Sequence, residues 1–204
     1  LDYFRGLYLY NIGRFYQDIG DLERSQLLLS LAIDIYTHPL NNDNKNALKA
    51  EITLANSLFY ANEQTNEALV HYGLAIELSR HIEADSYSTL VMAYTNAGNV
   101  LLKMNRLDSC IFISKKSIAM NRRKSAMDDV LLSSAHLNLG LALSQKNDLA
   151  GAQLNFDLAE KIILKAGGEN GFYTHVVYRS IGEEYARGRQ YDKALDFFQK
   201  GIIA

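Results

Sequence analysis

Apolar residues recur at helical spacing along most of the chain, and short polar stretches interrupt them. In YNIGRFYQDIGDLERSQLLLSLAIDI, residues 10–35, one apolar stripe includes Ile12 and Phe15, and a second follows the polar pair at Gly20 and Asp21. Apolar positions three and four apart predict two helices joined by a tight turn. Gly13 lies inside the first helix, where glycine costs about 0.5–1 kcal/mol relative to alanine, so its presence needs a packing reason.

The same two-helix pattern recurs at a fixed period. The position of Gly13 is taken in later copies by Ala55, Gly98, Gly140 and Gly182, and the last three are spaced 42 residues apart. Such self-similarity predicts an array of five repeats, at about 3–40, 44–83, 85–123, 127–167 and 171–204. One hairpin cannot bury its apolar face alone, so the hairpins must stack. We therefore expect an all-α fold, a single repeat domain spanning 1–204.

The second helix of each copy carries small residues at two fixed positions. Twelve residues after the glycine position stand Ser25, Cys110, Ala152 and Ala194, and seven further on stand Ala32, Ser117, Ala159 and Gly201. We expect each glycine to face a small residue, so that the two helices approach closely. A larger side chain at Gly98 or Gly140 would then overpack, at about 1–3 kcal/mol. Asp43 and Asp85 are predicted N-caps of first helices.

These residues resemble the tetratricopeptide repeat (TPR), whose signature sets aromatic, Leu-Gly, Tyr, Ala and Phe residues at fixed offsets. The fifth copy fits best, with Tyr178, Ile181-Gly182, Tyr185, Ala194 and Phe198. The usual period is about 34 residues, and the longer units here are similar to those of kinesin light chain and of bacterial TPR signalling proteins. The resemblance implies a right-handed α-solenoid of about five stacked TPR-like repeats, and it covers nearly the whole chain.

The resemblance also implies a concave groove lined by the first helices. Carried over by position, its predicted residues are Tyr10, Arg14, Asp18, Lys49, Asn56, Phe59, Tyr60, Asn99, Lys103, Leu141, Gln145, Arg179, Glu183 and Arg187. Five of these are basic and two are acidic, on a chain of net charge −2. We therefore expect the groove to bind a protein or peptide, either acidic or C-terminal. The alternative is that these charges form an ordinary solvated surface.

Two further patterns in this region have more than one interpretation. Asparagine side chains offer a donor and an acceptor together, so Asn56 and Asn99 are interpreted as contacts to a peptide backbone. The asparagines two residues before the glycine position, Asn11, Asn96 and Asn138, are interpreted as bonds within the array. Phe59, Tyr60 and Tyr10 line an apolar pocket in one reading and belong to the core in the other.

Composition narrows the function further. The net charge of −2 gives no field for nucleic acid, and no apolar run approaches a membrane span. The single cysteine, Cys110, is expected to be buried and inert, and no histidine pair has zinc-ligand spacing. We therefore expect no enzyme, no cofactor and no metal site, and a cytoplasmic location.

Three function classes remain open. The first is a scaffold or adaptor that binds a protein segment in the groove. The second is a regulatory arm of a longer transcriptional regulator or protease, whose output domain lies outside this segment; the terminal residues favour this reading. The third is self-association through the last helix, which ends in YDKALDFFQKGIIA and exposes Phe197, Phe198, Ile202 and Ile203 to any neighbour.

Overall fold

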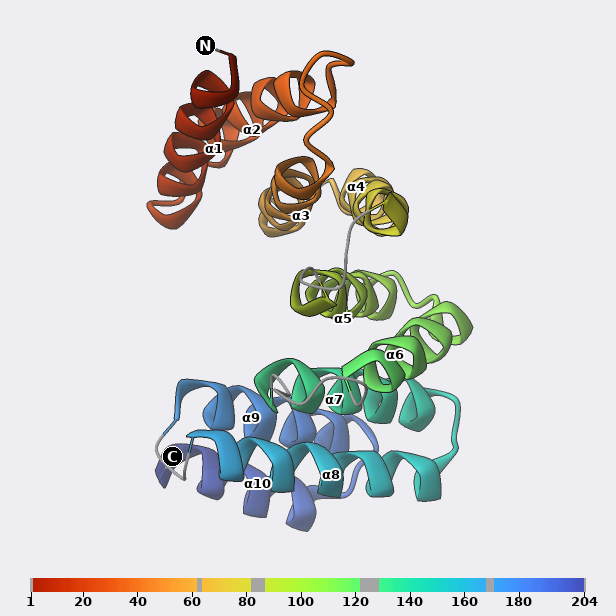
Figure 1. The fold of residues 1–204 in the computed structure, drawn as a ribbon. Coiled ribbons are helices and arrows are strands. Elements are labelled where there is room, and N and C mark those ends of the chain that lie inside the picture. Colours follow the sequence, from red (N-terminus) through yellow and green to blue (C-terminus); the bar gives the residue numbers. More distant parts are fainter. Residues whose placement is uncertain (1, 62–63, 82–86, 122–128, 168–170, 204) are drawn as a thin grey trace. The chain divides into compact units, whose positions relative to one another are not determined.

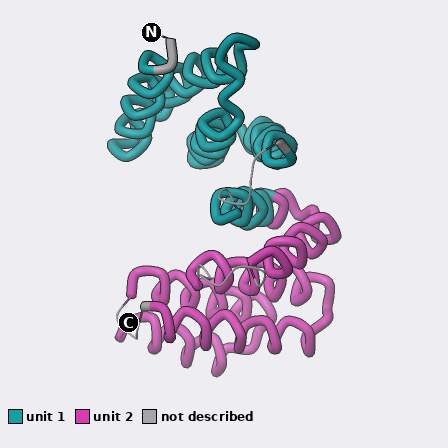
Figure 2. Tube along the Cα trace, in the orientation of Figure 1, with its two compact units in different colours: residues 1–100 teal, residues 101–204 magenta. Residues whose placement is uncertain are grey.

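The computed structural model describes residues 2–61, 64–81, 87–121, 129–167 and 171–203. The chain divides into two compact units, residues 1–100 (unit 1) and residues 101–204 (unit 2), coloured separately in Figure 2. Within the described ranges every regular element is a helix, which confirms the all-α prediction (Figure 1). In those ranges no helix is both long enough and apolar enough to cross a membrane.

Unit 1 is built from stacked helix hairpins. Its helices are α1 (Asp2–Asp18), α2 (Leu22–Thr37), α3 (Asn44–Tyr60), α4 (Thr65–Leu78), the short 3-10 helix η1 (Ser79–His81) and α5 (Tyr87–Lys103), whose last three residues belong to unit 2. Helices α1 and α2 pack together, as do α3 and α4, and α2 packs on α3. The second helix α2 thus covers α3, the first helix of the next hairpin.

Unit 2 repeats this arrangement. Its helices are α6 (Leu107–Asn121), α7 (Asp129–Gln145), α8 (Leu149–Gly167), α9 (Phe172–Arg187) and α10 (Tyr191–Ile203). The pairs α7–α8 and α9–α10 are hairpins, and α6 packs on α7 as α8 packs on α9. Of the predicted third repeat, 85–123, α5 lies mainly in unit 1 and α6 in unit 2, and the repeat bounds stay predictions. That the whole chain is one domain stays a prediction.

One turn type joins the two helices in four of the repeats. In each, a residue takes a left-handed backbone conformation: Gly20 (φ 84°), Asn105 (φ 55°), Asn147 (φ 65°) and Arg189 (φ 58°). The next N–H then donates to a carbonyl five residues back, as from Asp148 to Leu143 at 2.9 Å. This pattern is the Schellman motif, which favours glycine and asparagine. The tight turn predicted at Gly20 and Asp21 is therefore confirmed, and the same turn recurs at Asn105 and Asn147.

Aspartates cap two of the helices in unit 1. The Asp43 carboxylate accepts a hydrogen bond from the backbone N–H of Asn46 at 3.1 Å, as predicted for α3. Asp21 caps α2 in the same way, accepting from the N–H of Arg24 at 3.2 Å. Each bond satisfies one of the free N–H groups at a helix start. Asp85, the other predicted cap, lies outside the described residues.

The interior glycines pack mainly against large side chains, which the prediction did not include, although Gly140 also faces the predicted small residue, with the Ala152 carbonyl oxygen 3.3 Å from an added β-carbon. A β-carbon at Gly140 would lie 2.7 Å from the ring of Phe156, and one at Gly182 would lie 2.7 Å from Phe198. At Gly13 the nearest group is the side chain of Leu29, at 2.9 Å. These partners stand four residues, one helical turn, beyond the small positions. Glycine therefore makes room for a large side chain.

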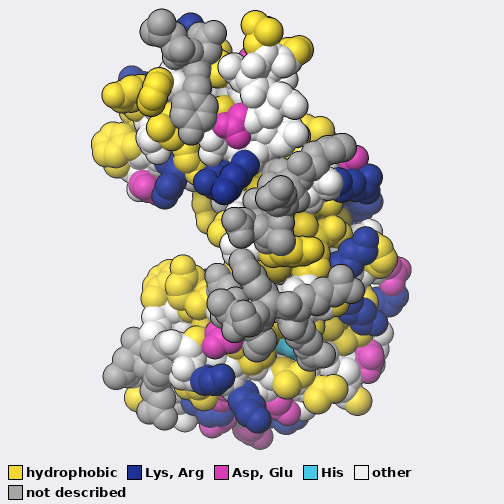
Figure 3. All heavy atoms as spheres, viewed as in Figure 1, with side chains coloured by type: hydrophobic (Ala, Val, Ile, Leu, Met, Phe, Trp, Pro, Cys, Tyr) yellow, Lys and Arg dark blue, Asp and Glu magenta, His cyan; other side chains and the backbone are white. Residues whose placement is uncertain are grey.

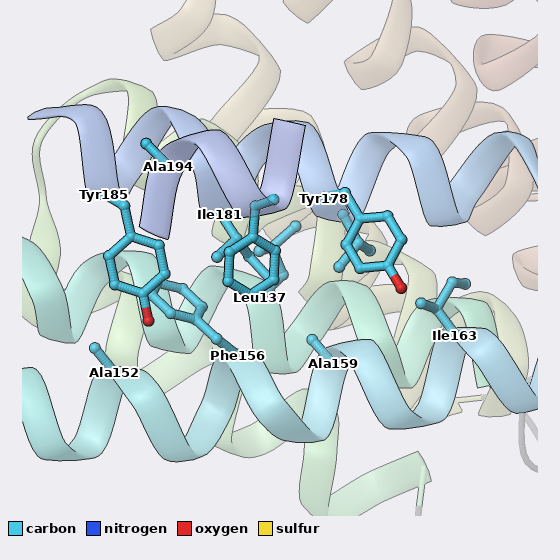
Figure 4. Close-up of a cluster of buried hydrophobic side chains, with 11 residues drawn as sticks. Leu137, Ala152, Phe156, Ala159, Ile163, Tyr178, Ile181, Tyr185 and Ala194 are labelled. Atoms are coloured by element: carbon cyan, nitrogen blue, oxygen red, sulfur yellow. The ribbon is translucent and has the colours of Figure 1, made fainter. Parts of the chain in front are cut away.

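The small positions of the second helices are nevertheless buried as predicted, from Ser25 and Cys110 to Ala194. Figure 4 shows how Ala152 and Ala159 on α8 face the side chains of α9. The rings of Phe156 and Tyr185 meet edge to face at 5.9 Å, and Tyr185 stacks on Phe197 at 5.6 Å. Small residues on one helix and aromatic rings on the next together fill the core of unit 2.

Candidate functional site

All fourteen predicted groove residues lie on the first helices of the repeats. In unit 1 these are Tyr10, Arg14 and Asp18 on α1, Lys49, Asn56, Phe59 and Tyr60 on α3, and Asn99 on α5. In unit 2 they are Lys103 at the end of α5, Leu141 and Gln145 on α7, and Arg179, Glu183 and Arg187 on α9.

On α1, an aromatic ring and a guanidinium lie one above the other. The guanidinium carbon of Arg14 lies 5.9 Å from the ring centroid of Tyr10, one helical turn away. On the same helix Gln17 donates from Nε2 to the backbone carbonyl of Thr53 at 3.4 Å, and so ties α1 to α3. Arg14 and Asp18 are exposed. The α1 part of the site therefore offers an exposed cation beside an aromatic ring.

Asn56 is the centre of a polar network in unit 1. Its Oδ1 accepts one hydrogen bond from the hydroxyl of Tyr72 on α4, at 2.5 Å, and another from Nδ2 of Asn96 on α5, at 2.9 Å. Burial raises the pKa of Tyr72 well above its usual range, with a further contribution from nearby Tyr60. The acceptor half of Asn56 is thus used inside the unit. In the described residues its Nδ2 makes no hydrogen bond.

This network bears on both readings of the asparagines. Asn96 bonds within the array, in agreement with its structural interpretation. The sequence predicts that the amide oxygen and the amide nitrogen of Asn56 both contact a peptide, but the oxygen already accepts hydrogen bonds from Tyr72 and Asn96. The sequence carried one signal for this. Tyr72 stands at the position of Leu29, Phe156 and Phe198, and a buried tyrosine needs a partner for its hydroxyl.

The C-terminal end of α3 presents two adjacent aromatic side chains. The ring centroids of Phe59 and Tyr60 lie 6.2 Å apart and tilted. Phe59 is half-buried, whereas Tyr60 is 62% exposed. Lys49, nearer the start of α3, is half-buried. Tyr60 is therefore the aromatic residue of this helix that is best placed to meet a partner.

Charges in unit 2 are largely paired. Arg179 and Glu183 lie one turn apart on α9 with Nε and Oε1 at 3.8 Å, both exposed. Arg187 forms a close ion pair with Glu184, whose carboxylate is buried. Arg187, a predicted groove cation, is thus paired with Glu184, which is not among the predicted residues. Because surrounding carboxylates offset both arginines, this face is less basic than the sequence count suggested.

The other three predicted residues of unit 2, Leu141, Gln145 and Lys103, differ in their exposure. Leu141 packs against the hydrophobic cluster of α8 and α9, so it belongs partly to the core. Gln145 is half-buried at the end of α7, and Lys103 is exposed at the end of α5. Unit 2 exposes four of its predicted residues, Lys103, Arg179, Glu183 and Arg187, but the three on α9 lie in ion pairs. Unit 1 exposes three, Arg14, Asp18 and Tyr60.

Histidines and the cysteine have structural partners. His71 on α4 contacts the buried carboxylate of Glu51 on α3 at 2.6 Å. Nδ1 of His136 lies 2.9 Å from Oδ1 of Asn155, and Nδ1 of His175 lies 2.8 Å from the carbonyl oxygen of Gly201. The Glu51–His71 pair could not be predicted from the sequence, because the two residues are 20 positions apart on different helices.

Cys110 is buried, as predicted, with its sulfur 3.7 Å from the carbonyl oxygen of Asn138. Burial raises the pKa of the Cys110 thiol, which favours the unreactive protonated form. Among the residues that the structure describes, no group of three or more His, Cys, Asp or Glu could hold a metal ion.

Comparison with solved structures decides the fold. BtubC (BKLC) from P. vanneervenii superposes with a TM-score of 0.71 at 18% identity, over 79% of this chain and 64% of that one. A putative kinesin light chain of nearly identical TPR-like repeats from Podosopora anserina gives 0.71 at 13% identity, over 96% and 92%. The chain has a TPR-like helical repeat fold. This confirms the resemblance inferred from the repeats.

A Rap protein complexed with competence and sporulation factor also matches, with a TM-score of 0.66 at 15% identity, over 99% of this chain and 64% of that one. The TPR-like chain thus spans less than two thirds of the length of BtubC and of this Rap protein. No protein-family model matches the sequence, and no curated protein does.

Proposed function

We propose that the chain is a protein-interaction module that binds an extended peptide or protein segment along the first helices of unit 1. The observation that carries this proposal is the state of Asn56. Two internal hydrogen bonds to its oxygen fix the plane of the side-chain amide and leave the Nδ2 donor for a peptide carbonyl. A side chain already held in its binding orientation loses little entropy when a partner arrives.

Neighbouring side chains supply complementary contacts. Exposed Tyr60 offers an aromatic surface one turn beyond Asn56, and Arg14 offers a cation on α1. An acidic side chain or a terminal carboxylate of the peptide would pair with Arg14 or Lys49. The Rap complex named above supports a partner of this general kind, since a TPR-like structure there is complexed with another factor.

A peptide library tests the proposal directly. Peptides of acidic, neutral and basic composition, each with a free or an amidated C-terminus, are titrated against the chain by fluorescence polarisation. We expect the acidic peptides to bind, and Tyr60→Ala to weaken that binding at least tenfold. Val70→Ala on α4 is the matched control, because Val70 is similarly exposed, at 60%, but lies on a second helix.

The free and amidated termini separate the two forms of the proposal. A loss of affinity on amidation indicates recognition of a terminal carboxylate, and equal affinity indicates recognition of acidic side chains. If no peptide class binds, or if Tyr60→Ala and Val70→Ala behave alike, the first-helix face of unit 1 is not the binding surface.

The second candidate is a regulatory arm within a longer protein. It is supported by the length comparison, because the chain matches only 64% of BtubC and of the Rap protein. Under this proposal, ligand binding along the first helices alters helix packing and so the output of a further domain. Hydrogen exchange of the complete reading-frame product with and without a bound acidic peptide would reveal protection extending outside residues 1–204, and protection confined to them would contradict it.

A further inference from the structure

Helix α1 carries an exposed apolar stripe, here called the α1 face, formed by Tyr8, Ile12, Phe15 and Ile19. At 3.6 residues per turn these four positions fall within an arc of about 60°. The side chains are between 44% and 69% exposed. An amphipathic helix normally turns such a stripe toward the core. Figure 3 shows hydrophobic side chains gathered over this part of unit 1.

The three positions of this face that lie within α1, Tyr8, Ile12 and Phe15, are buried in every later first helix. Aligned on the glycine position, Tyr8, Ile12 and Phe15 correspond to Ala50, Leu54 and Ser57 on α3, to Ala93, Ala97 and Val100 on α5, to Ala135, Leu139 and Ala142 on α7, and to Val177, Ile181 and Glu184 on α9. All twelve of these residues are buried. The α1 face is therefore the exposed equivalent of a surface that is buried on the other first helices.

Within each unit a second helix provides that cover. Ile118 on α6 is clustered with Ala135 and Leu139 on α7, and Ile111 packs against the same cluster. In unit 1, Ile33 on α2 packs against the cluster that holds Ala50 of α3. Ile33 and Ile118 each stand eight positions after the first small residue of their helix, Ser25 or Cys110. Each packs in the cluster that contains the equivalent of Tyr8, Ala50 or Ala135.

Helix α10 carries the other half of this interface in an exposed form, here called the α10 face: Tyr191, Leu195 and Ile202. Leu195 and Ile202 occupy the positions of Ile111 and Ile118. They are 57% and 83% exposed, whereas Ile111 is half-buried and Ile118 is buried. The chain therefore presents both halves of its own internal interface, one on α1 and one on α10.

We propose that copies of this chain bind one another end to end, with the α10 face of one copy packing on the α1 face of the next. Leu195 and Ile202 would then pack with Tyr8, Ile12 and Phe15, in the positions that Ile111 and Ile118 hold in the cluster with Ala135 and Leu139 of α7. The two faces are different surfaces, so the contact is heterologous and adds copies in a row.

Helices α1 and α10 each hold two acidic and two basic residues, so charge acts on this pairing only through the halves that carry them. Residues 1–100 hold 12 acidic and 6 basic residues, a net charge of −6, while residues 101–204 hold 11 acidic and 15 basic residues, a net charge of +4. A contact that joins α10 of one copy to α1 of the next brings oppositely charged halves together. A contact of α1 with α1 would join two negative halves and is disfavoured.

The larger side chains of α1 set the spacing of the contact. Tyr8 and Phe15 stand where α3 has Ala50 and Ser57. The incoming helix consequently lies farther from α1 than α2 lies from α3. The aromatic rings fill that extra space and enlarge the apolar area that is buried.

Sedimentation of the 204-residue chain with two variants tests the proposal. Ile12→Asp places a charge on the α1 face, and Ile202→Asp places one on the α10 face. We expect the wild type to show an average mass that rises with concentration, and each variant alone to sediment at the 23.0 kDa of one chain. Val70→Asp on α4, exposed and outside both faces, should associate like the wild type.

Mixing the two variants gives the decisive result. The Ile12→Asp copy keeps an intact α10 face and the Ile202→Asp copy keeps an intact α1 face, so an equimolar mixture should form a dimer and nothing larger. Circular dichroism of each variant confirms that it is folded, and formation of the mixed dimer is itself proof that the intact faces survive.

Four outcomes would overturn the proposal. They are a wild type that stays at 23.0 kDa up to its solubility limit, an Ile12→Asp variant that still associates, an Ile202→Asp variant that still associates, and a mixture that remains monomeric. Association that survives Ile202→Asp but not Ile12→Asp would show a symmetric contact through α1.

Discussion

At the scale of single residues, Asn56 has a structural task as well as a proposed binding one. From the sequence alone we would expect that replacing Asn56 and Asn99 leaves stability unchanged. The hydrogen bonds from Tyr72 and Asn96 change that expectation. Asn56→Ala removes the acceptor of the buried Tyr72 hydroxyl, which should cost about 1–3 kcal/mol of unfolding free energy. Urea denaturation followed by circular dichroism measures it.

The control for this prediction is Tyr72→Phe. If the cost of Asn56→Ala comes from an unsatisfied hydroxyl, the double variant should be more stable than the sum of the two single losses implies. Additive losses would show that the Tyr72–Asn56 bond contributes little. A binding experiment with Asn56→Ala must therefore be corrected for the unfolded fraction.

Glycines at two positions should respond to alanine with opposite signs. At Gly140 the added methyl group would meet the ring of Phe156, which is buried and cannot move aside, so we expect a loss of about 1–3 kcal/mol. Gly73 lies inside α4, exposed, with nothing within 4 Å of a β-carbon. There alanine should stabilise by about 0.5–1 kcal/mol through helix propensity. Thermal unfolding of both variants makes the comparison.

At the scale of helices, the caps and turns account for where each element begins and ends. Asp43→Ala should lower the unfolding free energy by about 1 kcal/mol, because the N–H of Asn46 loses its partner. Asp43→Asn keeps an oxygen acceptor and should recover most of that loss. Chemical denaturation distinguishes the two, and equal losses would mean that the charge of Asp43, rather than its hydrogen bond, stabilises α3.

The rate at which the Cys110 sulfur is alkylated reports on the packing between α6 and α7. Cys110 is buried on α6, and its sulfur contacts the carbonyl of Asn138 on α7. Because burial also raises the pKa of the thiol, alkylation at neutral pH requires that the helices separate. We expect iodoacetamide to react with native protein far more slowly than with urea-unfolded protein, and Gly140→Ala to accelerate the native reaction. Rapid labelling of the native wild type would contradict this.

Much of the helix-level organisation was predictable because the repeat makes each feature appear several times. The period, the turns at Gly20, Asn105 and Asn147, and the buried small residues all follow from local chemistry. Partners across a hairpin were less predictable. The contact of Gly140 with Phe156 depends on how two helices slide along each other, which residue spacing does not specify.

For the whole molecule, the limits of the sequence lie in pairings between distant helices. The ion pair of Glu51 with His71 and the hydrogen bonds on Asn56 join different helices, and no local pattern encodes them. The exposure of the α1 face was also missed. The sequence shows an apolar stripe there like that of any first helix, and only the structure shows what covers each stripe.

The size of Tyr8 and Phe15 has a consequence for how such an array can be rearranged. Repeat proteins lengthen when a hairpin is duplicated or moved, and this requires that the copies be interchangeable. Hairpin α1–α2 is not directly interchangeable with the others, because the buried residues at those positions in later hairpins, from Ala50 and Ser57 to Val177 and Glu184, are all smaller. A shuffled gene that moved this hairpin inward would need a wider spacing between hairpins at that place, whereas one that duplicated α7–α8 would extend the array with the spacing unchanged.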